Sequence, residues 1–232
     1  MSVLVYTSIT NNHDRLKLQP VFEEDKGAHI DYIAYLDRTT TASAEKSKTT
    51  EQWNIRVAVN NFKEPKRNCQ THKILSHMYI FDNDYNIWID GSVVFKAPVT
   101  KLIADNMDGA DIALLWHFER DCIYEEAKDC IHFNLDDPEK IYDQLDFYRQ
   151  INFPKHFGLS ETPVIIRRNT KDVMTFNNLW WSILCRYSKR DQLSFDFVRW
   201  TLAMPVNHIE GNIHENEYFS IAKHEVLRKH EK

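Results

Sequence analysis

One carboxylate stands where a divalent metal ion could bind, at the end of an apolar strand. The run YNIWID at 85–90 predicts a strand that stops on Asp90, Gly91 and Ser92. Ligands of open α/β sheets bind beyond the carboxyl ends of the strands, and Mg²⁺ and Mn²⁺ prefer oxygen donors. A metal site at Asp90 is therefore one interpretation. A plain turn is the other, since Asp-Gly is a common turn pair.

Three further polar clusters could carry chemistry, and one of them is the run GLSE at 158–161, which leads to VIIRRN at 164–169. Asp191 opens a segment whose pattern predicts a helix over 191–202. The helix dipole alone favours an acidic residue there. A carboxylate in a cleft could also serve as a general base or accept a hydrogen bond from a sugar hydroxyl. The run HFERDCIYEE at 117–126 follows directly after a predicted strand.

The elements that must position these residues alternate between strands and helices. Strands are predicted at 3–9, 29–36, 53–59, 85–90, 93–95, 111–116 and 163–167, and helices at 66–78, 99–107, 122–130, 137–150, 172–186 and 191–202. Segments 39–50 and 204–232 are expected to be loops. This alternation predicts an α/β fold with a mixed, mostly parallel sheet flanked by helices. Since we find no repeat and no linker, we expect a single domain over 1–232. The Trp180-Trp181 pair is expected in the core rather than in a binding site.

Composition excludes several function classes. The chain has only five glycines, no two of them close together, so it contains neither GxGxxG nor a phosphate-binding P-loop. Its 29 Lys and Arg against 34 Asp and Glu give a net charge of −5, which argues against duplex nucleic acid as the main partner. The four cysteines lack zinc-site spacing and indicate reduced thiols. Without a signal peptide or a membrane span, we expect a cytoplasmic protein, or one in the host cytoplasm if it is viral.

A series of motifs over about residues 3–200 resembles a known family. The motifs are VYTSIT, YLDR, KRNCQTHKIL, YNIWIDGS, HFERDCIYEEA, GLSETPVIIRRN, NLWW and SKRDQLSFDFV. They resemble the plant mucilage-type family of glycosyltransferases, and are similar to glycosyltransferase domains that algal viruses, phages and bacteria use on surface glycans. The resemblance implies a GT-A fold, a Rossmann-like sheet that takes a nucleotide-sugar and, usually, a divalent metal. It divides the chain into a nucleotide-sugar half at about 1–115 and an acceptor half at about 116–232.

The resemblance also implies a metal site. Asp90 occupies the position of the metal-binding Asp of the GT-A DxD motif, with Ser92 where the second Asp would stand. This departure puts full dependence on Mn²⁺ or Mg²⁺ in question. A late histidine often completes the metal shell in such chains. Of His208, His214 and His224 we favour His214, which lies in an expected loop.

Further roles follow from the resemblance, position by position. Nucleotide contacts are expected from the ends of the first two strands and from the basic segment, at Thr7, Ser8, Ile9, Asp37, Arg67, Lys73 and Asp90. Asp191 would be the catalytic residue, as general base in an inverting enzyme. Contacts to the sugar or the acceptor are expected from His117, Arg120, Glu125 and Gln192.

The leading hypothesis is thus a metal-assisted glycosyltransferase that moves a sugar from a nucleotide-sugar, with a UDP-sugar favoured, to a glycan or glycoprotein. The alternative is a non-catalytic module that binds a nucleotide-sugar or a glycan on the same fold. A metal-dependent phosphohydrolase or nuclease is a third, weaker hypothesis, because it needs a cluster of several carboxylates that the sequence does not show.

Overall fold

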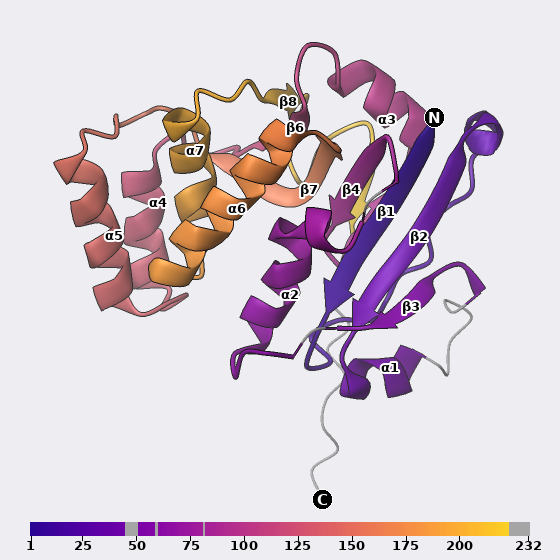
Figure 1. Ribbon diagram of the computed structural model, residues 1–232, viewed down its shortest axis with the longest axis horizontal. Coiled ribbons are helices and arrows are strands. Elements are labelled where there is room, and N and C mark those ends of the chain that lie inside the picture. Colours follow the sequence, from indigo (N-terminus) through magenta and orange to yellow (C-terminus); the bar gives the residue numbers. More distant parts are fainter. Residues whose placement is uncertain (45–50, 59, 81, 223–232) are drawn as a thin grey trace, which may run out of the picture.

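A single seven-stranded sheet forms the centre of the computed structural model, which describes residues 1–44, 51–58, 60–80 and 82–222 (Figure 1). The strand order is β3-β2-β1-β4-β7-β6-β8. The strands are β1 (Ser2–Ile9), β2 (His29–Leu36), β3 (Asn54–Val57), β4 (Tyr85–Ile89), β6 (Ile112–Trp116), β7 (Ser160–Arg168) and β8 (Asn207–Ile209). All pairings are parallel except the two that β7 makes, with β4 and β6. The predicted mixed, mostly parallel sheet in a single domain is confirmed.

Helices cover both faces of this sheet. They are α1 (Arg38–Ala44), α2 (Pro65–Ile74), α3 (Val99–Asn106), α4 (Ile123–His132), α5 (Pro138–Gln150), α6 (Lys171–Arg186) and α7 (Gln192–Thr201). In Figure 1, α2, α6 and α7 lie before the sheet, and α4 and α5 extend the molecule to the left. Two short 3-10 helices, η1 (Glu23–Gly27) and η3 (Ser76–Met78), and a small sheet of β5 (Val93–Phe95) with β9 (Phe219–Ile221) complete the described fold.

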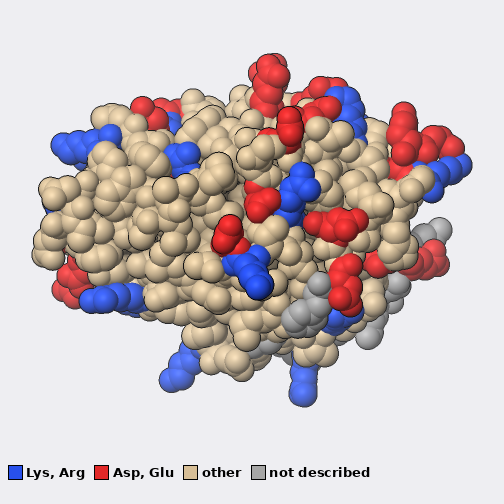
Figure 2. Space-filling view, turned by 45° about the horizontal axis from the view of Figure 1, so that its top comes forward, with Lys and Arg blue, Asp and Glu red and all other residues tan. Residues whose placement is uncertain are grey.

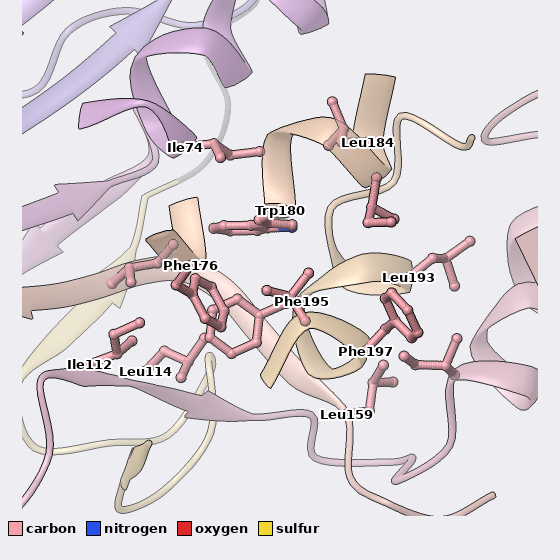
Figure 3. Packing of buried hydrophobic residues seen from close by; sticks show 14 of the residues in the cluster. Ile74, Ile112, Leu114, Leu159, Phe176, Trp180, Leu184, Leu193, Phe195 and Phe197 are labelled. Carbon is pink, nitrogen blue, oxygen red and sulfur yellow. The ribbon is translucent and has the colours of Figure 1, made fainter. Parts of the chain in front are cut away.

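Alternation along the central strands divides the core into two clusters. Leu4 and Tyr6 of β1 pack in the cluster that contains α2, α4, α5, α6 and α7, whereas Val3 and Val5 pack in the one that contains α3. Both faces of β1 are therefore buried, which explains its nearly continuous apolar sequence. Figure 3 shows the first cluster, where Trp180 of α6 lies among Phe176, Phe195 and Ile74.

The parallel strands β1, β2 and β4 end at the same edge of the sheet. Because β7 runs antiparallel to β4, with Val164 opposite Ile89, the first residues of β7 lie at that edge as well. The backbone N–H of Asp90 donates to the carbonyl of Pro163 at 2.8 Å, which joins the end of β4 to the start of β7. This topology brings segments 8–14, 90–92 and 161–163 together.

Three short elements differ from the sequence prediction. Helix α1 falls in the expected loop 39–50, and strands β8 and β9 fall in the expected loop after residue 204. β8 and β9 have three residues each, too few to show the alternation of apolar and polar residues that is typical of a strand. β8 forms by pairing with β6, and β9 by pairing with β5, so their structure depends on distant partners. No helix among the described residues is long and apolar enough to cross a membrane.

Trp180 and its neighbour allow a test of the core. Trp180 is fully buried, and its indole N–H donates to Ser194 Oγ at 3.0 Å, whereas Trp181 is only partly buried. We expect Trp180→Ala to lower the free energy of unfolding by about 3–5 kcal/mol, because it leaves a large cavity. Trp181→Ala should cost clearly less. Urea unfolding of both variants measures the difference, and equal losses would contradict this packing.

Candidate functional site

A pocket of about 660 Å³ opens at the shared strand edge. Its walls come from the loop after β1, from α2, from the turn after β4, from the start of β7 and from the segment that leads into α7. The charged residues that line it are Asp14, Lys66, Lys73, Asp90, Glu161, Arg190 and Asp191. On the face shown in Figure 2, acidic and basic side chains are interspersed, without a broad field of either sign. The pocket itself gathers seven charged side chains of both signs.

Lys73 contacts several of the polar and charged side chains that line the pocket. Its ammonium donates to Asp191 Oδ2 at 2.6 Å and to Thr162 Oγ1 at 3.0 Å, and it lies 3.6 Å from Asp90 Oδ1. The Thr162 hydroxyl in turn donates to the same Asp191 oxygen at 3.0 Å. One cation on α2 therefore contacts the residue after β4, a residue of β7 and the residue before α7.

Lys73 and Asp191 form a buried ion pair, so each strongly shifts the pKa of the other. Burial alone would lower the pKa of Lys73, but the carboxylates of Asp191 and Asp90 outweigh it, so the pKa is raised. Burial alone would raise the pKa of Asp191, but Lys73, Lys66 and Arg190 hold it far below its usual range. Both groups are therefore charged at neutral pH. An Asp191 carboxylate held in this way is a weak base.

The backbone behind Lys73 is held by a buried arginine. Arg167 of β7, only 1% exposed, donates from one guanidinium nitrogen to the Lys73 carbonyl at 2.7 Å and to the Tyr6 hydroxyl at 3.0 Å. The carbonyl near the end of α2 is thereby fixed to the central sheet. This contact gives Lys73 a rigid base from which to reach the pocket.

Asp90 keeps part of its carboxylate open to the pocket. Its Oδ1 accepts the Trp88 indole N–H at 2.7 Å, while the side chain as a whole remains 44% exposed. Ser92 and Asp14 line the same pocket. These are oxygen donors of the kind that Mg²⁺ and Mn²⁺ prefer, and such ions commonly take their remaining ligands from water and phosphate. The donor set fits a divalent ion.

Glu161 lies at another side of the pocket. Its Oε1 is 3.8 Å from His117 Nε2, which is itself 3.9 Å from Glu126 Oε2, and Arg120 binds Glu126 at 2.9 Å. Glu161 Oε2 is buried and has no hydrogen-bond partner in the structure. Burial, together with the charge of Glu126, raises the pKa of Glu161 to about 7.

The structure brings together some of the residues predicted from sequence. Ser8, Ile9, Lys73, Asp90, Asp191 and Gln192 all line the pocket. Gln192 Oε1 accepts a hydrogen bond from Arg190 at 2.9 Å. These positions come from both halves of the chain, so the expected site is assembled, whereas the individual roles stay predictions.

Other predicted site residues lie outside the pocket lining. Arg67 donates to the Leu184 carbonyl at 3.2 Å and so lies against α6. Asp37 accepts the backbone N–H groups of Asn11 at 2.6 Å and Thr40 at 2.8 Å, which ties the loop after β1 to the start of α1. Thr7 is buried beneath the site without lining it.

The sugar and acceptor residues predicted from the 117–126 run also lie outside the lining. His117 and Arg120 border the pocket through Glu161 and Glu126. Glu125 is exposed beside Asp121 and His156, and these three form the one group of at least three His, Cys, Asp or Glu donors within 4.8 Å among the described residues. That group lies apart from Asp90.

The late histidines differ in their surroundings. The ring of His214 meets the edge of Phe118, with centroids 5.5 Å apart, and its neighbour Ile213 rather than His214 lines the pocket. His208 stacks on Trp116, and burial lowers its pKa to about 3. His224 lies outside the described residues. Metal binding by His214 therefore stays a prediction.

Three charged residues that line the pocket were absent from the predicted set of site residues. Lys66, rather than Arg67, lines it, and burial lowers the pKa of the Lys66 ammonium. Arg190 and Glu161 line it as well. The helical phase of α2 could have distinguished Lys66 from Arg67, because Lys66 and Lys73 are seven residues, about two turns, apart and share a face. Glu161 lies in the GLSE cluster and in the motif GLSETPVIIRRN, but neither assigned it a role in the site.

The comparisons with known proteins agree with this geometry. Residues 1–227 match the model of a family described as TOD1/MUCI70, glycosyltransferase-like domain. The chain belongs to this family. It is also 22% identical over 223 residues to the Arabidopsis thaliana protein named "Probable hexosyltransferase MUCI70", covering 88% of this chain and 38% of that protein. The chain thus spans well under half the length of this relative.

Among solved structures, the chain is similar to mouse xyloside xylosyltransferase 1. The match has a TM-score of 0.55 at 9% identity, and it covers 90% of this chain and 85% of the mouse chain. The galactosyltransferase LgtC matches with a TM-score of 0.49 at 12% identity, over 90% and 73% of the two chains. The expected GT-A fold is confirmed, and the family and fold are those of glycosyltransferases.

Loss of the Asp191 carboxylate should destabilise the fold. Asp191→Asn leaves the buried Lys73 ammonium with only Asp90 and Thr162, so we expect a loss of about 3 kcal/mol in unfolding free energy. Asp143→Asn, on the exposed side of α5, is the matched control and should be neutral. Urea denaturation at pH 7 measures both, and an unchanged Asp191→Asn variant would contradict the proposed importance of the pair.

Gly91 offers a test of the turn after β4. A Cβ at this position would lie 2.9 Å from Ile9 Cδ1, so Gly91→Ala must displace the Ile9 side chain at the pocket wall. We expect the free energy of unfolding to fall by about 1 kcal/mol, and Ile9→Val should partly restore it in the same background.

Gly91→Val should keep the fold but lose binding of the donor nucleotide. Unchanged binding by Gly91→Val would reduce Gly91 to an ordinary turn residue.

Proposed function

We propose that the chain transfers a sugar from a nucleoside diphosphate sugar, a UDP-sugar in the favoured case, to a hydroxyl of a glycan or glycoprotein. The observation that carries this proposal is a set of polar atoms without hydrogen-bond partners on residues that line one pocket. They are Ser8 Oγ, Gln70 Oε1, Glu161 Oε2 and Arg190 Nε. Buried polar groups are normally paired, so unpaired ones in a single pocket favour a polar ligand there.

The charges of the pocket suggest how the donor would lie. Lys66, Lys73 and Arg190 supply positive charge for a diphosphate, and Ser8 and Ile9 at the end of β1 are placed for the base and ribose. The lowered pKa of Lys66 means that its charge is poorly compensated, so an anionic ligand would stabilise it. Sugar and acceptor would then extend toward Glu161 and Gln192.

A divalent ion, if bound, would be held by Asp90, with Ser92 beside it and His214 as the predicted histidine ligand. The ion would neutralise negative charge that develops on the leaving diphosphate. Lys73 already lies 3.6 Å from Asp90, so the protein contributes cationic charge of its own at this place. The remaining task of the chain is to orient the acceptor hydroxyl against the donor sugar and to receive its proton.

A reducing location fits this proposal. All four cysteines are free, and Cys122 and Cys130 are buried. Free thiols are typical of proteins kept in a cytosol-like compartment. Glycan synthesis in the cytoplasm is therefore the setting we propose.

Calorimetric titration with UDP tests the proposal. We expect a micromolar Kd with Mn²⁺ present, and an affinity at least about tenfold weaker when Mn²⁺ is omitted or when Asp90 is changed to alanine. Asp143→Ala, on the exposed side of α5, should bind as the wild type does. The absence of any UDP binding, together with unchanged behaviour of Asp90→Ala, would contradict the proposal.

Release of UDP from UDP-sugars then separates an enzyme from a binding module. An enzyme releases UDP when acceptor or water takes the sugar, whereas a non-catalytic module binds the nucleotide-sugar and leaves it intact. Binding without release across a panel of UDP-hexoses and UDP-pentoses, with and without glycan acceptors, would favour the module.

A further inference from the structure

We propose that Asp191 is a positioning residue for metal binding: its carboxylate holds the Lys73 ammonium away from Asp90, and so leaves Asp90 available to a divalent ion. The ion is the one that the proposed function places on Asp90, so the inference rests on that function. Asp191 acts here through Lys73, without contacting the ion.

The ammonium of Lys73 has two carboxylates near it, at unequal distances. It is 2.6 Å from Asp191 Oδ2 and 3.6 Å from Asp90 Oδ1. The first contact is a hydrogen bond, whereas the second distance is too long for one. Thr162 supports this placement, because its hydroxyl accepts from Lys73 at 3.0 Å and donates to the same Asp191 oxygen at 3.0 Å. The lysine is therefore bound to Asp191, and Asp90 is its next neighbour of opposite charge.

Asp90 is accessible, whereas Asp191 is not. The side chain of Asp90 is 44% exposed, against 10% for Asp191 and 6% for Lys73. The Trp88 indole N–H donates to Asp90 Oδ1 at 2.7 Å, and this oxygen is also the one near Lys73. Among the contacts of the described residues, Oδ2 of Asp90 is thus left for an ion. The accessible carboxylate is suited to a metal, and the buried one to the lysine.

Lys73 and a divalent ion would compete for Asp90. Two cations at one carboxylate repel each other, and the repulsion is strong where little water screens it. The lysine side chain has a flexible four-carbon stem, although Arg167 holds the backbone carbonyl at 2.7 Å. An ammonium that lost Asp191 would turn to the nearest remaining carboxylate of the described residues, which is Asp90. Asp191 prevents this competition by binding the ammonium itself.

The alternative role for Asp191 is that of a direct metal ligand. A ligand contributes to ion binding whether or not Lys73 is present. A positioning residue acts only through the ammonium, so its contribution disappears when the ammonium is removed. The coupling between the two residues therefore distinguishes the roles.

A double-mutant cycle of Asp191→Asn and Lys73→Met tests this assignment, with the Kd of Mn²⁺ as the readout. Electron paramagnetic resonance of Mn²⁺ measures this Kd on the full chain, without nucleotide and at saturating UDP. We expect Asp191→Asn to weaken Mn²⁺ binding roughly tenfold and Lys73→Met to tighten it by a similar factor. In the Lys73→Met background, Asp191→Asn should change the Kd by less than about twofold.

Two further variants guard against an effect of folding. Asp191→Asn is expected to destabilise the fold, so circular dichroism must show that each variant is folded at the temperature of the measurement. Thr162→Val is milder, because it removes one hydrogen bond to the ammonium and keeps the ion pair. It should weaken Mn²⁺ binding by about threefold, and only while Lys73 is present. Asp143→Asn, on the exposed side of α5, should bind Mn²⁺ as the wild type does.

The outcomes separate this inference from the proposed function. Wild-type Mn²⁺ affinity in Asp191→Asn, or an equal loss with and without Lys73, would overturn the inference alone. A wild type that binds no Mn²⁺, with or without UDP, would overturn the inference and the metal-assisted form of transfer together. A wild type that shows the expected coupling but releases no UDP from any UDP-sugar would overturn transfer, while the role of Asp191 at the metal site would stand.

Discussion

The pocket depends on one buried ion pair, between Lys73 on α2 and Asp191 before α7. Removing either charge from water is costly, and the cost is recovered only where the partner and further hydrogen bonds are in place. Here Thr162 supplies the additional bond, and Arg167 holds the Lys73 carbonyl. Lys73 lies 89 positions before Thr162 and 118 positions before Asp191, so these charges meet only when the fold is correctly assembled.

The pair also divides the chemistry of the pocket. On one side, Lys66 and Lys73 face Asp90 and the end of β1, where an anionic diphosphate is favoured. On the other side, Glu161 is surrounded by Glu126 and by an Arg120 already bound to acids, which keeps its carboxyl basic. Asp191 neutralises the charge of Lys73.

Much of the fold could be predicted from the sequence because its central strands are buried on both faces. β2 and β5 have the bounds that the pattern predicts, and β1 and β4 end at the expected edge. The resemblance placed Asp90 and Asp191 in one site, and both line the pocket. The short strands β8 and β9 could not be predicted, because each forms only by pairing with a distant strand.

The site was less predictable for a related reason. Arg67 and Lys66 are adjacent in sequence, but only Lys66 lines the pocket, since neighbouring helical residues point in different directions. Glu161 stood in a noted cluster but received no role, because the burial and the charge of Glu126 that raise its pKa arise only in the folded chain. Asp37, by contrast, was expected at the nucleotide and instead holds Asn11, which does line the pocket.

A crystal structure with UDP and Mn²⁺ bound tests the central claim most directly. The account predicts that the diphosphate lies between Lys66 and Asp90, with the ion on the Asp90 carboxylate and the uridine beside Ser8 and Ile9. The terminal phosphate of UDP should face Glu161. An ordered UDP that lies outside this pocket, for example with its metal at the exposed group of Asp121, Glu125 and His156, would contradict it.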